Sequence, residues 1–369
     1  MNARRLSGAV LALVVLLAAP SLASGQTGTR YVNPTDPTCG GQAPCYATIQ
    51  AAVTAALPGE RIVLQAGTYP EQVSITGKNN TAGASEADRI VIEADPAAAL
   101  GSVVLTPPTT QCTLGHAVRF QQSKFITLRG LTITGAGGQA ISLMGGNNQN
   151  QAIHLERLRI VGNGSPECDG GITIARGNPD TLILNSLIYA NGRNGLTTID
   201  ADGGPHYVIG NTIHGNAWSG VSVSRNHDIF LVNNAIIGNG TASGSTGGRF
   251  GVTREASTTP NPAGIHVLNN LVCGNRLGEI NGPALDATDS ENLTPTGSEG
   301  LGVSASPGCE VAASVYANLN GPDGLPNTAD DDFRLSTGSP ALDQGMDPRT
   351  LGLPASFTPL LETDFTGVS

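Results

Sequence analysis

Residues 232–239, VNNAIIGN, contain the pattern that decides the fold. An apolar residue is followed by two variable residues, an apolar residue, one variable residue, an apolar residue and then Gly or Asn. Six copies, spaced 23 to 36 residues apart, begin at Leu128, Leu155, Leu184, Ile209, Val232 and Leu268. An asparagine follows every copy after the first: Asn163, Asn191, Asn216, Asn239 and Asn275. A unit this short cannot bury its own apolar face, so the units must stack on one another.

A second short segment follows the asparagine in four of these repeats. The segments are Gly171–Ile174, Gly195–Thr198, Gly220–Val223 and Gly251–Thr253, and each alternates with the period of two that is typical of a half-buried strand. Several short strands and Gly- or Asn-rich turns per repeat predict an all-β protein, a parallel β-helix with one coil per repeat. Arg61 to Leu285 leaves room for about nine coils. The recurring asparagines are then expected to form an internal ladder.

The composition agrees with this fold and excludes several others. Glycine makes up 49 of 369 residues, the charged share is 13%, and the formal net charge is −10. A collagen-like period is absent from the sequence, a long coiled coil needs more charge, and 39% apolar residues are enough to build a core. An acidic chain with only two lysines also argues against binding nucleic acid through a basic face.

The N-terminus predicts export from the cell. Arg4 and Arg5 precede an apolar run over 9–19 and small residues at 21–23, which is the order of a secretory signal peptide over residues 1–23. An uncleaved anchor is the alternative, but the apolar run is short for a membrane span. After cleavage we expect no transmembrane segment, and a secreted or cell-surface monomer.

Six cysteines in an exported chain favour disulfides. Six cysteines allow 15 pairings, which sequence cannot distinguish. The turn-forming residues between Cys39 and Cys45 make that pair our prediction.

A helix is predicted over residues 46–57, YATIQAAVTAAL, because its apolar residues follow a helical period and Pro58-Gly59 ends it. This helix would cover the first coil of the solenoid. The predicted organisation is therefore an N-terminal cap over 24–60, the β-helix over 61–310, and a C-terminal cap or anchor-related segment over 311–369.

Two stretches resemble known proteins. Tyr46 to Ile75 is similar to the start of right-handed parallel β-helix proteins of the pectate-lyase-like superfamily, and the repeats match that group in style. Residues 332–345, DFRLSTGSPALDQG, resemble the C-terminal segment of secreted bacterial β-helix proteins that carry a "choice-of-anchor Q" domain. The resemblance implies a right-handed helix. It leaves the function open among polysaccharide lyases, hydrolases, epimerases, adhesins and proteins without known activity.

The second strands define the outer face on which the lyases of this superfamily usually carry their catalytic groups. Ile172, Leu196 and Val221 are expected to point inward, which turns Thr173, Thr197 and Ser222 outward. This face carries hydroxyls and small groups but no acid or base, which departs from the lyase pattern.

Charged residues do follow these strands. Arg176, Asp200 and Arg225 fall in one column, and Asp202 and His227 fall in the column two residues later, with His206 nearby. An exposed ladder of ion pairs is one interpretation. The other is a site for a uronate carboxylate, in which Arg176, Arg225 or His227 takes the proton alpha to that carboxyl in a β-elimination.

The remaining roles in that site are assigned to binding. Asp200, Asp202 and His206 would bind substrate, and the two aspartates could also hold Ca²⁺. Trp218 either stacks on a sugar or packs against protein. His214 occupies the slot of Ile133 and Ile160 in the other repeats, so it is predicted to point into the core.

An acidic loop near the C-terminus is a candidate calcium site. It gathers four carboxylates and one amide, from Asp323, Asn327, Asp330, Asp331 and Asp332. Calcium prefers several oxygen ligands on flexible loops. A solvated acidic turn is the alternative.

These observations favour a secreted protein that binds or processes extracellular polysaccharide or a cell-surface glycan. A polyuronate lyase of the pectate or alginate type is the enzymatic form of that hypothesis, with Ca²⁺ as the candidate cofactor. The alternative is a non-catalytic structural or surface-interaction protein whose exposed turns are its binding surface.

Overall fold

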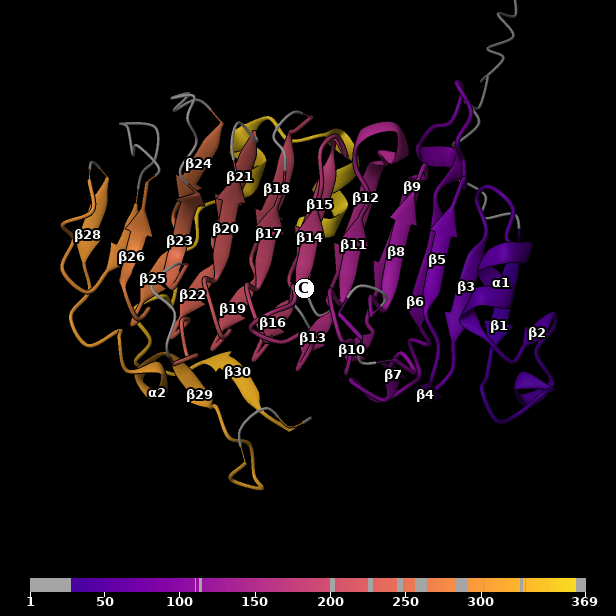
Figure 1. Cartoon of the computed structure of the whole chain (residues 1–369), viewed down its shortest axis with the longest axis horizontal. Helices are drawn as coiled ribbons and strands as arrows, with labels where there is room; N and C mark the ends of the chain where they lie inside the picture. Colours follow the sequence, from indigo (N-terminus) through magenta and orange to yellow (C-terminus); the bar gives the residue numbers. More distant parts are fainter. Residues whose placement is uncertain are drawn as a thin grey trace, which may run out of the picture.

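The computed structural model describes residues 28–109, 111–112, 115–199, 203–224, 228–243, 248–255, 264–282, 291–300, 302–325, 328 and 330–362. Three parallel sheets run side by side along one solenoid, as Figure 1 shows. The predicted right-handed parallel β-helix is confirmed. From β3 to β26, each coil contributes one short strand to each sheet, in the order A, B, C.

Sheet A contains, in spatial order, β2 (Cys45–Tyr46), β1 (Thr29–Val32), β3 (Arg61–Leu64), β6 (Ile90–Ala94), β9 (Lys124–Arg129), β12 (Gln151–Glu156), β15 (Thr181–Leu184), β18 (His206–Ile209), β21 (Ile229–Val232) and β24 (Ile265–Leu268).

Sheet B contains β4 (Gly67–Tyr69), β7 (Val103–Leu105), β10 (Thr132–Thr134), β13 (Arg159–Val161), β16 (Leu187–Tyr189), β19 (Thr212–His214), β22 (Ala235–Ile237), β25 (Leu271–Cys273), β27 (Asn292–Thr294) and β28 (Val303–Ala305). Sheet C contains β5 (Val73–Thr76), β8 (Val118–Gln121), β11 (Ile141–Leu143), β14 (Ile172–Ile174), β17 (Leu196–Thr198), β20 (Val221–Ser224), β23 (Phe250–Glu255) and β26 (Gly278–Asn281).

The predicted asparagine ladder lies between sheets B and C. Asn163 Nδ2 donates to Asn191 Oδ1 at 3.1 Å, Asn191 to Asn216 at 3.0 Å, and Asn216 to Asn239 at 2.9 Å. The ladder continues to Asn275, whose Nδ2 donates to Glu279 Oε2 at 2.6 Å. These amides are buried. Because water cannot reach the turns there, each amide supplies the hydrogen bonds that the turn needs.

A second ladder, between sheets A and B, was not predicted. Asn211 Nδ2 donates to Asn234 Oδ1 at 3.1 Å, Asn234 to Asn270 at 2.9 Å, and Asn270 to Asn292 at 3.2 Å. The residue before each ladder position adopts a left-handed backbone, with φ of 65° at Gly210, 54° at Asn233 and 51° at Asn269. Glycine and asparagine tolerate that region best, which explains their abundance.

The helix of the N-terminal cap is shorter than predicted, and strand pairing begins before it. β1 already pairs with β3, so the solenoid starts before Arg61. Helix α1 spans Ile49–Ala55, because the Thr48 side chain accepts from the Ala51 N–H and caps it, while Tyr46 belongs to β2. α1 lies over the first coil, as expected (Figure 1).

Three disulfides join Cys39 to Cys45, Cys112 to Cys168, and Cys273 to Cys309. The predicted first pair is confirmed. Disulfides persist in oxidising compartments, so all three are consistent with secretion. No helix among the described residues is long and apolar enough to cross a membrane. The predicted signal peptide lies outside the described residues.

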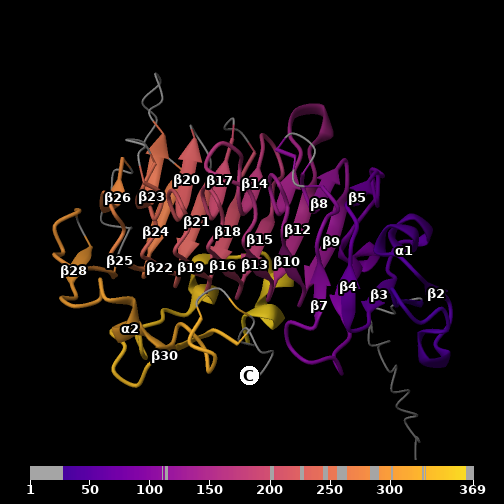
Figure 2. The same cartoon turned by 60° about the horizontal axis from the view of Figure 1, so that its bottom comes forward.

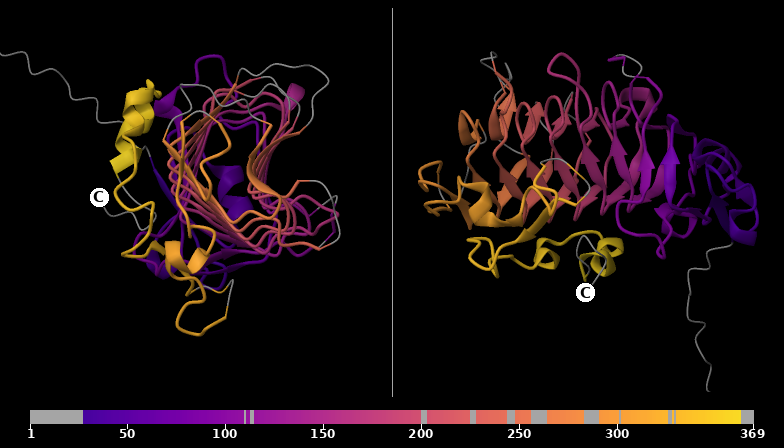
Figure 3. Two further views of the ribbon diagram at one scale, coloured as in Figure 1. Left: turned by 90° about the vertical axis from the view of Figure 1, so that its left-hand side faces the viewer. Right: turned by 90° about the horizontal axis from the view of Figure 1, so that it is seen from below.

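Residues 312–362 form a C-terminal strap that turns back along the flank of the solenoid, as Figure 2 shows. Helix α2 (Ala312–Val315) and the antiparallel pair β29 (Tyr316–Asn318) and β30 (Asp332–Leu335) contribute Tyr316 and Phe333 to an apolar cluster on the outer face of sheet B. The 3₁₀ helices η4 (Pro348–Leu351) and η5 (Ala355–Glu362) cover the outer face of sheet A. The strap therefore leaves sheet C as the face it does not cover (Figure 3).

Candidate functional site

The outer face of sheet C carries a continuous column of hydroxyl groups. Register pairs Ser142 with Thr173, Thr173 with Thr197, and Thr197 with Ser222. Ile172, Leu196 and Val221 lie in the inner core, so the prediction that Thr173, Thr197 and Ser222 face outward is confirmed. Thr173 is only 4% exposed and Ser222 only 2%, whereas Thr197 is partly exposed.

The same column contains an arginine that the sequence reading missed. Arg119 pairs with Ser142 on one side and Ser74 on the other. The alternation of residues 118–121, VRFQ, could have indicated it: Val118 and Phe120 are core residues, so Arg119 between them faces outward. Arg119 therefore adds a cation at the end of the hydroxyl column.

Beside this column, a row of four side chains lies on the turns that precede the strands of sheet C. Asp169, Arg193, Trp218 and Arg249 occupy equivalent positions on four successive coils, since the residues that follow them are joined by backbone hydrogen bonds. Arg193 Nη1 contacts Asp169 Oδ1 at 3.3 Å, and its guanidinium lies 4.5 Å from the centre of the Trp218 ring. Gly248 of the next coil also lies against that ring. Trp218 is therefore packed between coils, with one face occupied by Arg193.

The predicted catalytic column is only partly described. Arg176 is exposed directly after β14, and its carbonyl accepts from the Gly146 N–H. Arg225, His227, Asp200 and Asp202 lie outside the described residues. The proposed grouping of Arg176 with these residues stays a prediction.

Two histidines lie in environments other than those that the sequence predicted. His206 opens β18 and is fully buried between Thr181 and Ile229, whose column faces the inner core. A polysaccharide cannot touch it there, so its assignment to substrate binding is wrong. The core position in β19 belongs to Ile213, and His214 points outward beneath the strap.

The His214 prediction is wrong because of a one-residue slip in register. Ile160 pairs with Ile188, and Ile188 with Ile213, whereas the sequence alignment set Ile160 against Tyr189 and His214. A shift of one residue moves a side chain to the other face of a strand. Outside the core, His214 lies 5.7 Å from both Tyr316 and Phe333, and burial lowers its pKa to about 4.

In the described part of the acidic loop the carboxylates bind protein groups. Asp330 Oδ1 accepts from the Thr328 hydroxyl at 2.6 Å, and Asp331 Oδ2 accepts from the Thr328 N–H. Arg334 pairs with Asp332 at 2.6 Å and holds the pKa of that carboxyl below its usual value. The described residues, which omit Asn327, contain no group of three or more acidic, His or Cys side chains placed to hold a metal. Asp323 lies on the same loop, and calcium there stays a prediction.

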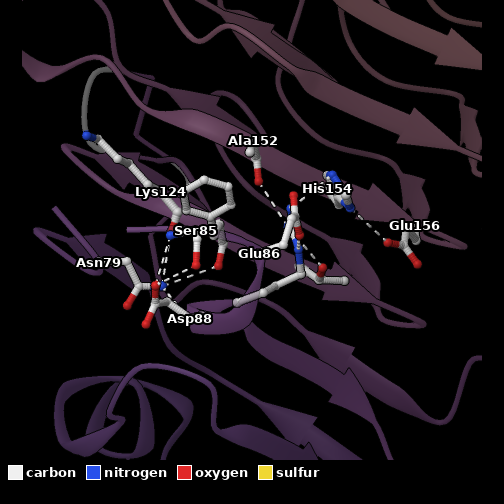
Figure 4. Close-up of polar contacts among 11 residues, drawn as sticks. Asn79, Ser85, Glu86, Asp88, Lys124, Ala152, His154 and Glu156 are labelled. Atoms are coloured by element: carbon white, nitrogen blue, oxygen red, sulfur yellow. Dashed lines mark hydrogen bonds and ion pairs between the residues drawn. The ribbon is translucent and has the colours of Figure 1, made fainter. Parts of the chain in front are cut away.

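A buried polar cluster on sheet A was not predicted (Figure 4). His154 lies 3.2 Å from Arg89 Nη2 and 3.5 Å from Glu156 Oε1, and Arg89 pairs with Glu86 at 2.7 Å. Burial lowers the pKa of His154. Phe357 of the strap covers this histidine. The cluster therefore anchors the strap, and it lies on a different face from the sheet C column.

Comparisons with known proteins agree with this architecture. Residues 109–272 match the family model of the right-handed β-helix region. None of the curated proteins compared with the chain matches it. The matched region and the three parallel sheets together show the right-handed parallel β-helix fold.

Solved structures place it beside carbohydrate-active proteins in fold. Pectate lyase Pel9A is 17% identical, with a TM-score of 0.56 over 88% of this chain and 92% of that chain. A rhamnogalacturonan lyase is 14% identical, with a TM-score of 0.53 over 84% and 97%. The GH136 lacto-N-biosidase from Eubacterium ramulus is 13% identical, with a TM-score of 0.50 over 72% and 55%. At these identities the likeness shows the fold alone.

Proposed function

We propose that the protein binds and processes an extracellular polysaccharide along the outer face of sheet C. The observation that carries this proposal is the column of Arg119, Ser142, Thr173, Thr197 and Ser222, which runs parallel to the solenoid axis. The eight described strands of sheet C extend over about 34 Å at the usual strand spacing. Arg119 and Thr197 are partly exposed, so a linear polymer laid along that column can contact both of them.

The specific reaction we propose is β-elimination of a polyuronate. A base removes the proton alpha to the uronate carboxyl, the electron pair forms a carbon–carbon double bond, and the glycosidic oxygen leaves and takes up a proton. Arg176, Arg225 and His227 are the proposed bases, and Ca²⁺ is the proposed counter-ion for the carboxylates. Two lyases among the solved structures of similar fold support this choice of reaction class.

A non-catalytic glycan-binding protein is the second candidate, and one observation favours it. Among the described residues, the outward side chains of β11, β14, β17 and β20 include no acid or base: Ser142, Thr173, Thr197, Ser222 and Ser224 contribute only hydroxyl groups. Hydroxyls bind sugars but are poor proton acceptors at neutral pH.

One experiment separates the two candidates. The mature protein is mixed with polygalacturonate, alginate or rhamnogalacturonan, with calcium or with chelator, and ultraviolet absorbance is followed. β-Elimination produces an unsaturated uronate, so absorbance rises if the lyase proposal is correct. Binding measured by affinity electrophoresis without any rise identifies the non-catalytic protein. Neither binding nor a rise with any glycan contradicts the proposed function itself.

A further inference from the structure

Three side chains on successive turns before sheet C carry hydrogen-bond donors that no described residue accepts. Arg249 is 3% exposed, and its Nε and Nη2 have no hydrogen-bond partner among the described residues. The indole Nε1 of Trp218 and the Nε of Arg193 are likewise buried without a partner. Guanidinium and indole groups carry no acceptor, so the three side chains present donors only.

The nearest carboxylate of the row is already used. Asp169 Oδ1 contacts Arg193 Nη1 at 3.3 Å, and Asp169 Oδ2 accepts from Gln139 Nε2 at 2.5 Å. Arg249 lies two coils beyond Arg193, on the far side of Trp218. The single acid of the row therefore neutralises its first arginine and leaves the second without a counter-charge in the row.

Burial of an arginine without an acceptor is costly, and folded proteins rarely keep one without a reason. In a chain of net charge −10 with only 19 cations, carboxylates are plentiful elsewhere. A group retained at this cost is typical of a binding site whose ligand supplies the acceptor.

The row adjoins the hydroxyl column of sheet C. Asn194, the residue after Arg193, donates from Nδ2 to Thr197 Oγ1 at 3.1 Å, and Thr197 belongs to that column. The Arg193 side chain is 33% exposed, so this end of the row is open to solvent. A polymer lying on sheet C thus passes beside the donors.

We propose that Arg249, together with Arg193 and Trp218, binds an anionic substituent of the polysaccharide, a carboxylate or a sulfate ester. This inference rests on the proposed function and adds to it the residues that distinguish an acidic glycan from a neutral one. A guanidinium suits such an oxyanion because it can donate two parallel hydrogen bonds to it. The role is in binding, and no proton transfer is assigned to these residues.

The test compares the full mature protein with Arg249→Met, which keeps the length of the side chain and removes its donors. Affinity is measured for polygalacturonate and alginate, which carry carboxylates, for dextran sulfate, and for neutral dextran. The carboxylate and sulfate arms tell the two possible anions apart. Arg349→Gln, at an exposed arginine of the strap, is the matched control.

We expect Arg249→Met to weaken binding of the preferred acidic polymer about tenfold or more, to flatten its salt dependence, and to leave the melting temperature equal or higher. The control should change neither property. Unchanged affinity in a folded Arg249→Met protein overturns the inference but leaves the proposed function intact, because ordered water would then satisfy the donors.

A second variant covers a failure of Arg249→Met to fold. Arg193→Gln changes the more exposed arginine, and the same loss of acidic-polymer binding is expected. Equal affinity of the unmodified protein for neutral and acidic polymers also overturns the inference. Absence of binding to every polymer contradicts the proposed function as well.

Discussion

The phenyl ring of Phe357 packs edge-on against the imidazole of His154, with 5.1 Å between the ring centroids. The same phenyl ring lies 5.2 Å from Tyr207, and Phe357 is 1% exposed. Phe357 belongs to the C-terminal strap, while His154 and Tyr207 belong to sheet A. One aromatic contact thus joins the end of the chain to the middle of the solenoid.

Replacement of this anchor should loosen the strap. Phe357→Ala removes a buried aromatic side chain, and we expect it to cost about 3–5 kcal/mol in the free energy of unfolding of the strap. Hydrogen exchange of residues 344–362 measures that local opening. Leu342→Ala, at a strap residue that is 43% exposed, should change it by less than about 0.5 kcal/mol. Equal protection of both variants would show that Phe357 is not an anchor.

Acid should weaken the strap through His214. Its pKa is about 4 in the folded protein because of burial, against an ordinary value of 6.5, so the unfolded chain binds the proton more readily. The stabilisation is therefore complete above about pH 6.5 and is lost as the pH falls toward 4. His154, which faces Arg89, Glu156, Glu86 and Phe357, has a pKa shifted in the same direction by burial.

The melting temperature measured from pH 7.5 to 4 at constant ionic strength checks this dependence. His214→Phe keeps an aromatic ring against Tyr316 and Phe333 and removes the titrating group. Its melting temperature should fall less steeply below pH 6.5 than that of the unmodified protein. Parallel profiles for the two proteins would rule out His214 as a source of the acid sensitivity.

Interruption of the asparagine ladder should destabilise the solenoid. Asn216 is fully buried, and its Oδ1 accepts from both the backbone N–H and the Nδ2 of Asn191. Asn216→Ala leaves these two donors without a partner, which should cost at least about 2 kcal/mol. Chemical denaturation measures the loss. Asn318→Ala, at an exposed residue of β29, is the control and should be nearly neutral.

The disulfide Cys273–Cys309 joins β25 to the segment before the strap. Replacing both cysteines with alanine frees a loop whose ends are separated by 36 residues, and we expect a loss of about 2–4 kcal/mol. Thermal denaturation without reductant checks this. The double variant keeps two disulfides. These should be the only cause of a difference in melting temperature between it and the reduced unmodified protein.

Calcium at the acidic loop can be tested by chelation. If Asp323, Asp330 and Asp331 hold the ion, EDTA lowers the melting temperature and added calcium restores it. Asp330→Asn should abolish that response. A melting curve that is identical with chelator and with calcium dismisses the site, and would agree with the contacts of Asp330 and Asp331 to Thr328.

Much of the fold could be predicted because its physical demands repeat along the chain. Each coil needs an amide at the same buried turn. Asn163, Asn191 and Asn216 therefore recur in the sequence, and this recurrence predicts the ladder. The turn residues between Cys39 and Cys45 likewise indicated their disulfide. The second ladder through Asn211 and Asn234 carried the same signal, but those residues were counted as variable positions of the repeat.

The candidate site was less predictable, because its members come from successive coils and only register brings them together. Trp218 was singled out, but Arg193 and Arg249 were not. Neither arginine belongs to a local motif, and each gains its place from the backbone hydrogen bonds between turns. Whether an arginine lacks an acceptor is a property of the packed structure alone.

By itself, the sequence determined the class of fold, the axis along which coils stack and the residues of the main ladder. Only the tertiary structure decided which side of the strands of sheets A and B faces the core. The strap covers the outer faces of sheets A and B, so outward residues such as Leu184 and Ile209 are apolar as well. Where both faces of a strand are buried, the alternation that reveals register disappears. His206 was therefore not recognised as a core residue, and His214 was assigned to the core although it lies on the outer face beneath the strap.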